Sequence, residues 1–132
     1  MENIHYLGGK SYAELPKYLG NWDVAIMPFA LNDSTKYISP TKTPEFLAGG
    51  KPVVSTAITD VINPYEREGL VSIARSAEEF VQACETALSQ RNDKIWLKRV
   101  DEFLANISWD MTCETMQRQI LLSSQRSRSL LA

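Results

Sequence analysis

The chain has 132 residues, enough for one domain with a buried core, and its 44% hydrophobic and 23% charged residues are typical of a globular protein. Its net charge of −2 and the lack of a long run of like charges argue against nucleic acid as the main partner. The single histidine, His5, excludes a metal site built from several histidines. The sequence contains no apolar run long enough to cross a bilayer and no signal-peptide pattern, so we expect no transmembrane segment and a cytoplasmic location.

The first elements expected along the chain are a strand, a helix and a second strand. Residues 3–7, NIHYL, predict a short strand that Gly8-Gly9 ends. Residues 12–19 place apolar and aromatic side chains at helical spacing, with a Gly-Asn pair after them as a stop. Residues 23–29, DVAIMPF, form an apolar run, as expected for a strand that is buried on both faces.

The later elements continue the alternation of helices and strands. A polar stretch without periodicity leads to a short helix that ends at Gly49-Gly50, and a strand at 52–56 and a loop follow. Ser76, with Glu79 three residues later, forms a capping-box pattern at the start of a helix. The remaining elements are a strand at 69–74 and helices at 76–90, at 93–105 and from about 108 into the tail.

Short apolar strands that alternate with helices predict an α/β fold, a Rossmann-like parallel sheet flanked by helices. About four strands are expected, whereas a doubly wound nucleotide-binding domain usually has five or six. We therefore expect a single domain over residues 1–132, incomplete at its N-terminal side, with a terminal helix and tail from about 108 to 132. An uncovered sheet edge favours self-association, so a homodimer through that edge is one expected arrangement.

The cysteines and the aromatic residues are assigned to the core. Cys84 and Cys113 fall in expected helices without CxxC spacing, which indicates two apolar core residues in a reducing compartment. An aromatic side chain could instead stack on a nucleobase, but core packing is the simpler expectation for each. The aromatic residues considered are Tyr12, Trp22, Tyr37, Phe46, Trp96 and Trp109.

The stretch ISPTKTPEFLAGGKPVVST, residues 38–56, is the strongest candidate for a ligand site. Neither Gly-Gly-Lys sequence of the chain completes a phosphate-binding loop. In open α/β sheets, ligands bind outside the carboxyl ends of the strands, and this stretch follows such an end. Its helix, which Ser39, Thr41 or Thr43 can cap, offers free N–H groups and a positive dipole end that suit a pyrophosphate.

Lys42 and Glu45 are the charged residues of this helix, and they allow two interpretations. Lys42 could add positive charge for a diphosphate, and Glu45, on the same helix face, could accept hydrogen bonds from vicinal sugar hydroxyls. Alternatively, the two side chains form an exposed ion pair between residues i and i+3. On spacing alone, the ion pair is slightly favoured.

Residues 40–55 fit the pattern P-x-K-x-x-E-[FY]-L-A-x-G-x-P-V-V-[ST], and this stretch resembles the donor-nucleotide segment of GT-B glycosyltransferases of the large retaining, family-4-like group. The similarity extends to residues 3–29, 76–88 and 107–116, so it covers nearly the whole chain. It implies the C-terminal donor-binding half of a GT-B fold, with a nucleotide-sugar (NDP-sugar) as substrate.

The resemblance also implies roles for single residues. Glu45 would hold the nucleotide ribose, and the loop at 31–37 would lie near the donor sugar. A further glutamate of many relatives would fall at Tyr37, which leaves Asp33 as the candidate to replace it. No cofactor and no metal are expected, because Lys42 and the helix start supply positive charge. The donor-nucleotide segment would comprise Ser39, Pro40, Thr41, Lys42 and Glu45.

The sequence thus predicts the NDP-sugar donor-binding domain of a glycosyltransferase whose acceptor is unknown. The acceptor-binding N-terminal domain and the basic residues that neutralise the leaving diphosphate would lie upstream of the strand at 3–7, so this chain alone should be inactive. Two alternatives stay open. One is a noncatalytic α/β module that dimerises or binds a protein through an open sheet edge, and the other is a fragment of a GT-B-type nucleotide-sugar epimerase.

Overall fold

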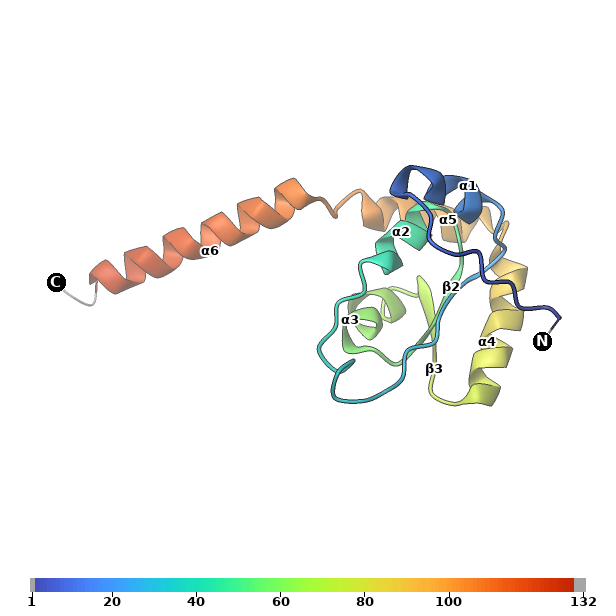
Figure 1. Cartoon of the computed structure of the whole chain (residues 1–132). Helices are drawn as coiled ribbons and strands as arrows, with labels where there is room; N and C mark the ends of the chain where they lie inside the picture. The colour runs from blue at the N-terminus through green and yellow to red at the C-terminus, as the bar shows by residue number, and fades with distance from the viewer. Residues whose placement is uncertain (1, 130–132) are drawn as a thin grey trace. The chain divides into compact units, whose positions relative to one another are not determined.

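The computed structural model describes residues 2–129 (Figure 1). The chain divides into two compact units, Met1–Val100 and Asp101–Ala132, and each is described by itself. The strands of the first unit are β1 (Ala25–Met27), β2 (Val53–Thr56) and β3 (Val71–Ala74). Its helical elements are the 3-10 turn η1 (Tyr12–Glu14), α1 (Leu15–Gly20), α2 (Lys42–Ala48), α3 (Thr59–Val61), the π-helical turn η2 (Ile62–Glu66) and α4 (Ala77–Gln90). Helix α5 (Lys94–Leu104) crosses the boundary between the units, and α6 (Trp109–Ser129) belongs to the second unit.

The described residues form one sheet of three parallel strands in the order β1-β2-β3. Val53 of the central strand pairs with Ala25 of β1 and with Val71 of β3. In Figure 1, α2 and α3 lie on one side of this sheet and α4 lies on the other. The centre of the core is β2, where Val53, Val54 and Ser55 are almost fully buried. The expected Rossmann-like α/β architecture is therefore confirmed as a partial, open parallel sheet.

The strand expected at residues 3–7 is absent, so the expectation of about four strands is wrong for the described residues. The segment has no regular secondary structure and pairs with no strand, and Ile4, Tyr6 and Leu7 are all more than half exposed. An apolar alternating pattern forms a strand only where a neighbour completes its hydrogen-bond ladder. Among the described residues, β1 pairs with β2 alone, and its other edge does not pair with this segment.

Two other local predictions are also wrong. The strand β1 is buried on one face only, because Ile26, which points away from its two buried neighbours, is 53% exposed. The stretch after β2, expected to be a loop, instead forms α3 and η2. Ile58 and Val61 of this stretch are buried, and Pro64 concealed the short helical turns in the sequence pattern.

The expected helix boundaries agree well with the structure. Helix α1 ends at Gly20, α2 is followed by the C-cap Gly49, and Ser76 caps α4 by accepting a hydrogen bond from the Glu79 N–H. The cysteines agree only in part, because Cys84 is half-buried in α4 and Cys113 is exposed on α6. Burial raises the pKa of the Cys84 thiol. No helix within residues 2–129 is long and apolar enough to span a membrane.

Candidate functional site

The candidate site lies in the first unit, where the chain leaves the carboxyl ends of the parallel strands. The loop at 28–41 follows β1 and leads into α2, Ala57 and Ile58 follow β2, and Arg75 follows β3. In open parallel sheets this edge is where ligands bind. The residues predicted for the site all lie in the first two turns of α2 or in the loop before it.

Helix α2 is fixed to the sheet by two side chains that face inward. Thr43 and Leu47, four residues apart, are both buried, and the Thr43 hydroxyl lies 3.9 Å from the sulfur of Met27 in β1. This anchoring leaves Lys42 exposed and Glu45 half-buried. Lys42 and Glu45 form no ion pair with each other within the part of the chain that the structure describes, so the ion-pair alternative is wrong for this geometry.

The start of α2 differs from the expectation in one respect. Thr41 occupies the N-cap position, but it has helical dihedral angles and its side chain makes no capping hydrogen bond. Thr43 faces the core and Ser39 is exposed, so neither replaces it. A helix of only seven residues also has a short dipole, so the charge of Lys42 is the main positive feature at this end.

A cavity of about 490 Å³ lies between α1 and α2, and we call it the aromatic cavity. Both Lys42 and Glu45 line it, which brings the two predicted charged residues together at one hollow. The Tyr12 hydroxyl donates a long hydrogen bond of 3.5 Å to Oε1 of Glu45. The lining residues are Tyr12, Leu15, Pro16, Tyr18, Leu19, Trp22, Lys42, Glu45, Phe46, Ala48 and Gly49.

The aromatic side chains of this cavity were not predicted as site residues. Core packing is wrong for Tyr12, which is 77% exposed, and incomplete for Trp22, which is 41% exposed and meets Phe46 edge-on at 5.9 Å between ring centroids. Core packing is confirmed for Trp96, which is buried. The helical spacing of 12–19 signalled one apolar face but not the helix that this face meets.

A second cavity, of about 320 Å³, lies between the loop after β1 and the start of α3, and we call it the loop cavity. Asp33 lines it together with Asn32, Lys36 and Thr59 among others. The Asn32 side chain shapes the loop, because its Oδ1 accepts hydrogen bonds from the N–H groups of Ser34 and Thr35 at 3.0 and 3.2 Å. Asp33 is thereby held at an exposed turn.

Tyr37, Ser39 and Pro40 do not line the aromatic cavity with Lys42 and Glu45. Tyr37 is 84% exposed, with the Lys36 ammonium 5.3 Å from its ring centroid, and it does not line the loop cavity. Ser39 is exposed and Pro40 half-buried. The structure therefore brings Lys42 and Glu45 together at the aromatic cavity and places Asp33 at the loop cavity.

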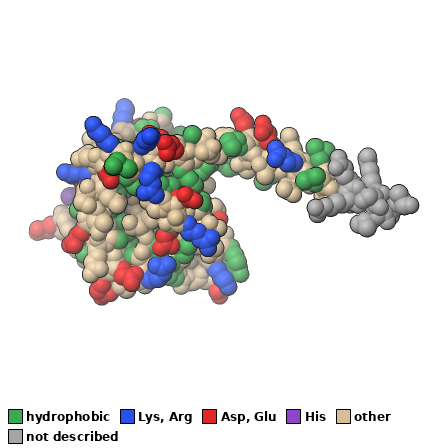
Figure 2. Space-filling model, turned by 180° about the vertical axis from the view of Figure 1, so that it is seen from behind, with side chains coloured by type: hydrophobic (Ala, Val, Ile, Leu, Met, Phe, Trp, Pro, Cys, Tyr) green, Lys and Arg blue, Asp and Glu red, His purple; other side chains and the backbone are tan. Residues whose placement is uncertain are grey.

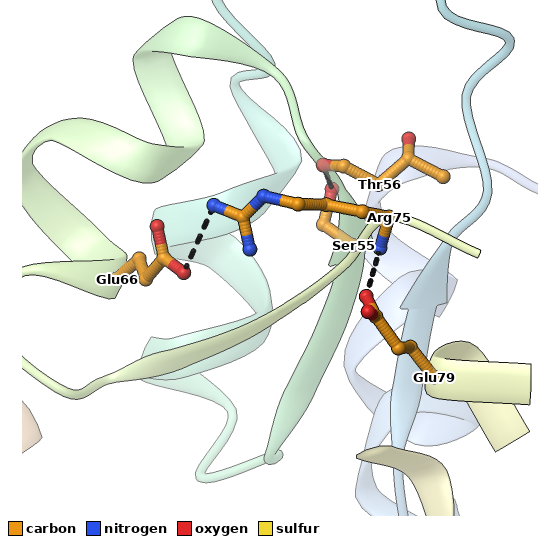
Figure 3. Close-up of polar contacts among 5 residues, drawn as sticks. All are labelled: Ser55, Thr56, Glu66, Arg75 and Glu79. Carbon is orange, nitrogen blue, oxygen red and sulfur yellow. Dashed lines mark hydrogen bonds and ion pairs between the residues drawn. The ribbon is translucent and has the colours of Figure 1, made fainter. Parts of the chain in front are cut away.

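The polar groups after β3 are already bonded to one another (Figure 3). The Arg75 guanidinium lies 3.7 Å from the Glu66 carboxylate, and the Arg75 N–H donates to Oε2 of Glu79 at 2.7 Å. In β2, the Ser55 hydroxyl donates to the carbonyl of Thr56 at 2.9 Å. Arg75, Glu66 and Glu79 are thus engaged with one another on this side of the sheet edge.

Side chains of both charges are mixed on the surface of the described residues. Figure 2 shows lysine and arginine side chains interspersed with aspartate and glutamate over the face that it presents. No group of three His, Cys, Asp or Glu side chains suited to a metal ion occurs among residues 2–129. Among the residues that line the aromatic cavity, the positively charged side chain is that of Lys42.

The fold is a partial Rossmann-like domain, an open parallel α/β sheet with a cavity beside its first crossover helix. Residues 1–90 match the family described as glycosyl transferases group 1, and the chain belongs to this family, which confirms the resemblance to GT-B glycosyltransferases. Over 124 residues the chain is 30% identical to TuaH of Bacillus subtilis (strain 168), named as a teichuronic acid biosynthesis glycosyltransferase. The alignment covers 92% of this chain and 30% of TuaH, so the chain spans less than a third of that relative. No solved structure matches the chain significantly.

Proposed function

We propose that this chain is the donor-binding domain of a glycosyltransferase and that it binds an NDP-sugar at the first turns of α2. The observation that carries the proposal is that Lys42 and Glu45, which have no ion pair between them, line the same cavity on α2, the helix that follows β1. Both charges are available to a ligand that carries an anionic group next to a pair of hydroxyls. A ribonucleoside diphosphate has this combination.

Each charged side chain has a distinct part in the proposed complex. The Glu45 carboxylate accepts hydrogen bonds from the 2′- and 3′-hydroxyls of the ribose, an arrangement that acidic residues make with nucleotides in related folds. Lys42 donates to the diphosphate as a point charge. Residues 39–41 lie against the diphosphate. Asp33, in the loop cavity, contacts the transferred sugar.

This complex assigns binding and orientation to the chain, and no metal is required. During sugar transfer, negative charge develops on the departing diphosphate, and a cation held beside it lowers the barrier. We further propose that the acceptor site and the remaining groups that act on the diphosphate are not among these 132 residues, so that this chain alone does not transfer sugar. A cytoplasmic location fits a nucleotide-sugar substrate and stays a prediction.

Nucleotide titration tests the proposal. Isothermal titration with UDP, GDP and ADP, each in the presence of EDTA, should give saturable binding for at least one of them. Glu45→Ala should weaken this binding by roughly 10- to 100-fold, because hydrogen bonds to a charged group are worth about 1.5–3 kcal/mol. The control is Glu85→Ala, which removes an exposed carboxylate from α4 and should leave the affinity unchanged.

A second candidate function is favoured by the exposed Ile26 on the edge strand β1. This candidate is a noncatalytic module in which two copies pair through the β1 edge. Sedimentation of the purified chain distinguishes the two. A tight dimer that binds none of the three nucleotides supports the module and contradicts the donor site, whereas nucleotide binding that depends on Glu45 supports the donor site in either oligomeric state.

A further inference from the structure

Four aromatic rings line the aromatic cavity, and three of them already contact another side chain through the ring. Trp22 and Phe46 meet edge-on, and the Tyr18 ring carries the Lys10 ammonium at 5.4 Å from its centroid. The Tyr12 ring, in η1, is the most exposed of the four. Its face is therefore the one best placed to receive a planar ligand.

The hydroxyl of Tyr12 ties this ring to the proposed ribose contact. It lies 3.5 Å from Oε1 of Glu45, so the tyrosine ring and the carboxylate border the same part of the cavity. In a ribonucleotide, the base is attached to the carbon next to the one that bears the 2′-hydroxyl. A carboxylate that holds the ribose hydroxyls consequently places the base within a few ångströms of itself, where the Tyr12 ring lies.

We propose that Tyr12 is the stacking partner of the donor nucleobase and that its hydroxyl orients Glu45 toward the ribose. The base enters the mouth of the aromatic cavity and lies against the Tyr12 ring, with the apolar side chains of α1 and α2 behind it. This inference rests on the proposed donor-binding function and extends it to a residue outside the segment at 39–45.

The size and lining of the cavity fit this occupant. Its volume of about 490 Å³ falls in the range of small-molecule sites and accommodates a nucleoside. Apart from Lys42, Glu45 and the tyrosine hydroxyls, the lining side chains are apolar or aromatic, so water is readily displaced by a flat ring. Stacking of a base on an aromatic side chain tolerates any base, because every base has a π-face.

The test separates the base from the rest of the nucleotide. Two probes are used: the tightest binder among UDP, GDP and ADP, and ribose 5-phosphate, which lacks a base. Binding of each probe is measured from the shifts of NMR signals of the intact chain. Tyr12→Ala should lower the affinity for the nucleoside diphosphate by roughly tenfold, the typical value for loss of a stacking ring. The affinity for ribose 5-phosphate should change by less than about threefold, because that loss involves only the weak contact to Glu45.

Matched variants distinguish the contribution of the Tyr12 ring from that of its hydroxyl. Tyr12→Phe keeps the ring and should retain the nucleotide affinity within about threefold. Tyr6→Ala removes a tyrosine that is even more exposed and does not line the cavity, and it should change neither affinity. Because Tyr12 is exposed, the thermal midpoint of Tyr12→Ala should match that of the unaltered chain, which excludes loss of folding as the cause.

Trp22 supplies an independent readout because it lines the same cavity. Nucleotide should change the tryptophan emission of the chain, ribose 5-phosphate should not, and Trp22→Phe should remove the change. Nucleotide binding that depends on Glu45 but not on Tyr12 overturns this inference and leaves the donor site intact. An equal loss of affinity for the nucleoside diphosphate and for ribose 5-phosphate in Tyr12→Ala also overturns it. If the unaltered chain shows no saturable nucleotide binding, both proposals are overturned.

Discussion

The starts of α2 and α4 lie near the same edge of the sheet, yet their polar groups are arranged in opposite ways. At α4, the Ser76 hydroxyl caps the helix and Glu79 accepts the Arg75 N–H. The Arg75 guanidinium meets Glu66 (Figure 3). At α2, no side chain caps the helix, and Lys42 and Glu45 are not paired with each other.

The difference separates structural polar groups from polar groups that can bind a ligand. A polar group that is satisfied inside the protein contributes to stability and has little left for a ligand. A polar group left open at a cavity keeps its hydrogen-bonding capacity for another molecule. We therefore expect substitutions of polar residues at the start of α2 to change nucleotide binding, and those at the start of α4 to change folding stability.

The largest expected effect concerns the anchor that holds the open helix in place. Leu47 is 1% exposed and packs α2 on the sheet, so Leu47→Ala should lower the free energy of unfolding by about 2–5 kcal/mol. Urea unfolding followed by circular dichroism measures this change. The control is Leu88→Ala on α4, which is 46% exposed and should cost well under half as much. Equal costs for the two variants would mean that α2 is not fixed by core packing.

The next effect is on binding and concerns Lys42. Lys42→Met should lower the affinity for a nucleoside diphosphate by about tenfold and the affinity for the corresponding nucleoside by less than twofold. The reason is that the lysine is proposed to contact only the diphosphate. It should also reduce the dependence of the affinity on salt. The matched control is Lys98→Met on α5, a lysine that lines neither the aromatic nor the loop cavity. A nucleoside affinity that falls as much as the diphosphate affinity would contradict this assignment.

The local pattern of the sequence was sufficient for most of the fold, including the short helix that carries Lys42 and Glu45. Gly49, Gly20 and Ser76 end or begin helices where expected, because capping depends on residues close in sequence. The strand at 3–7 failed because strand formation needs a partner that no local pattern reveals. Tyr12 was assigned to the core because spacing shows that a face is apolar but not whether another helix covers it.

The pairing of Lys42 with Glu45 could not be decided from spacing alone, since i,i+3 neighbours can reach each other without doing so. In the structure, Glu45 turns toward Tyr12 of η1, a residue 33 positions earlier. This long-range contact and the cavity between α1 and α2 argue against the ion-pair interpretation and are compatible with a ligand site. The roles of the two residues in binding stay predictions until the titrations are done.

A smaller effect, on stability alone, is expected at the start of α4. Ser76→Ala removes the cap bonded to the Glu79 N–H at 3.2 Å and should lower the free energy of unfolding by about 1 kcal/mol. Nucleotide affinity should not change. Ser89→Ala, in the last turn of the same helix, serves as the control and should cost only a few tenths of a kcal/mol, because its hydroxyl bonds the Thr86 carbonyl and caps no N–H group. A loss of nucleotide affinity in Ser76→Ala would place α4 in the binding site.

The smallest effect is expected for the ion pair between Arg75 and Glu66, whose side chains are 59% and 32% exposed. A double-mutant cycle with Arg75→Met and Glu66→Gln should give a coupling free energy of about 0.5 kcal/mol or less, further reduced by salt. The same Arg75→Met variant is also the sharpest test of the contrast between the two helix starts. Arg75 is the cation that follows β3, as Lys42 is the cation at the start of α2 after β1, so a bound diphosphate could in principle recruit either. If Arg75→Met weakens nucleotide binding as much as Lys42→Met does, its pairing with Glu66 does not withdraw it from the ligand, and the division between a structural and a ligand-binding side of the sheet edge is wrong.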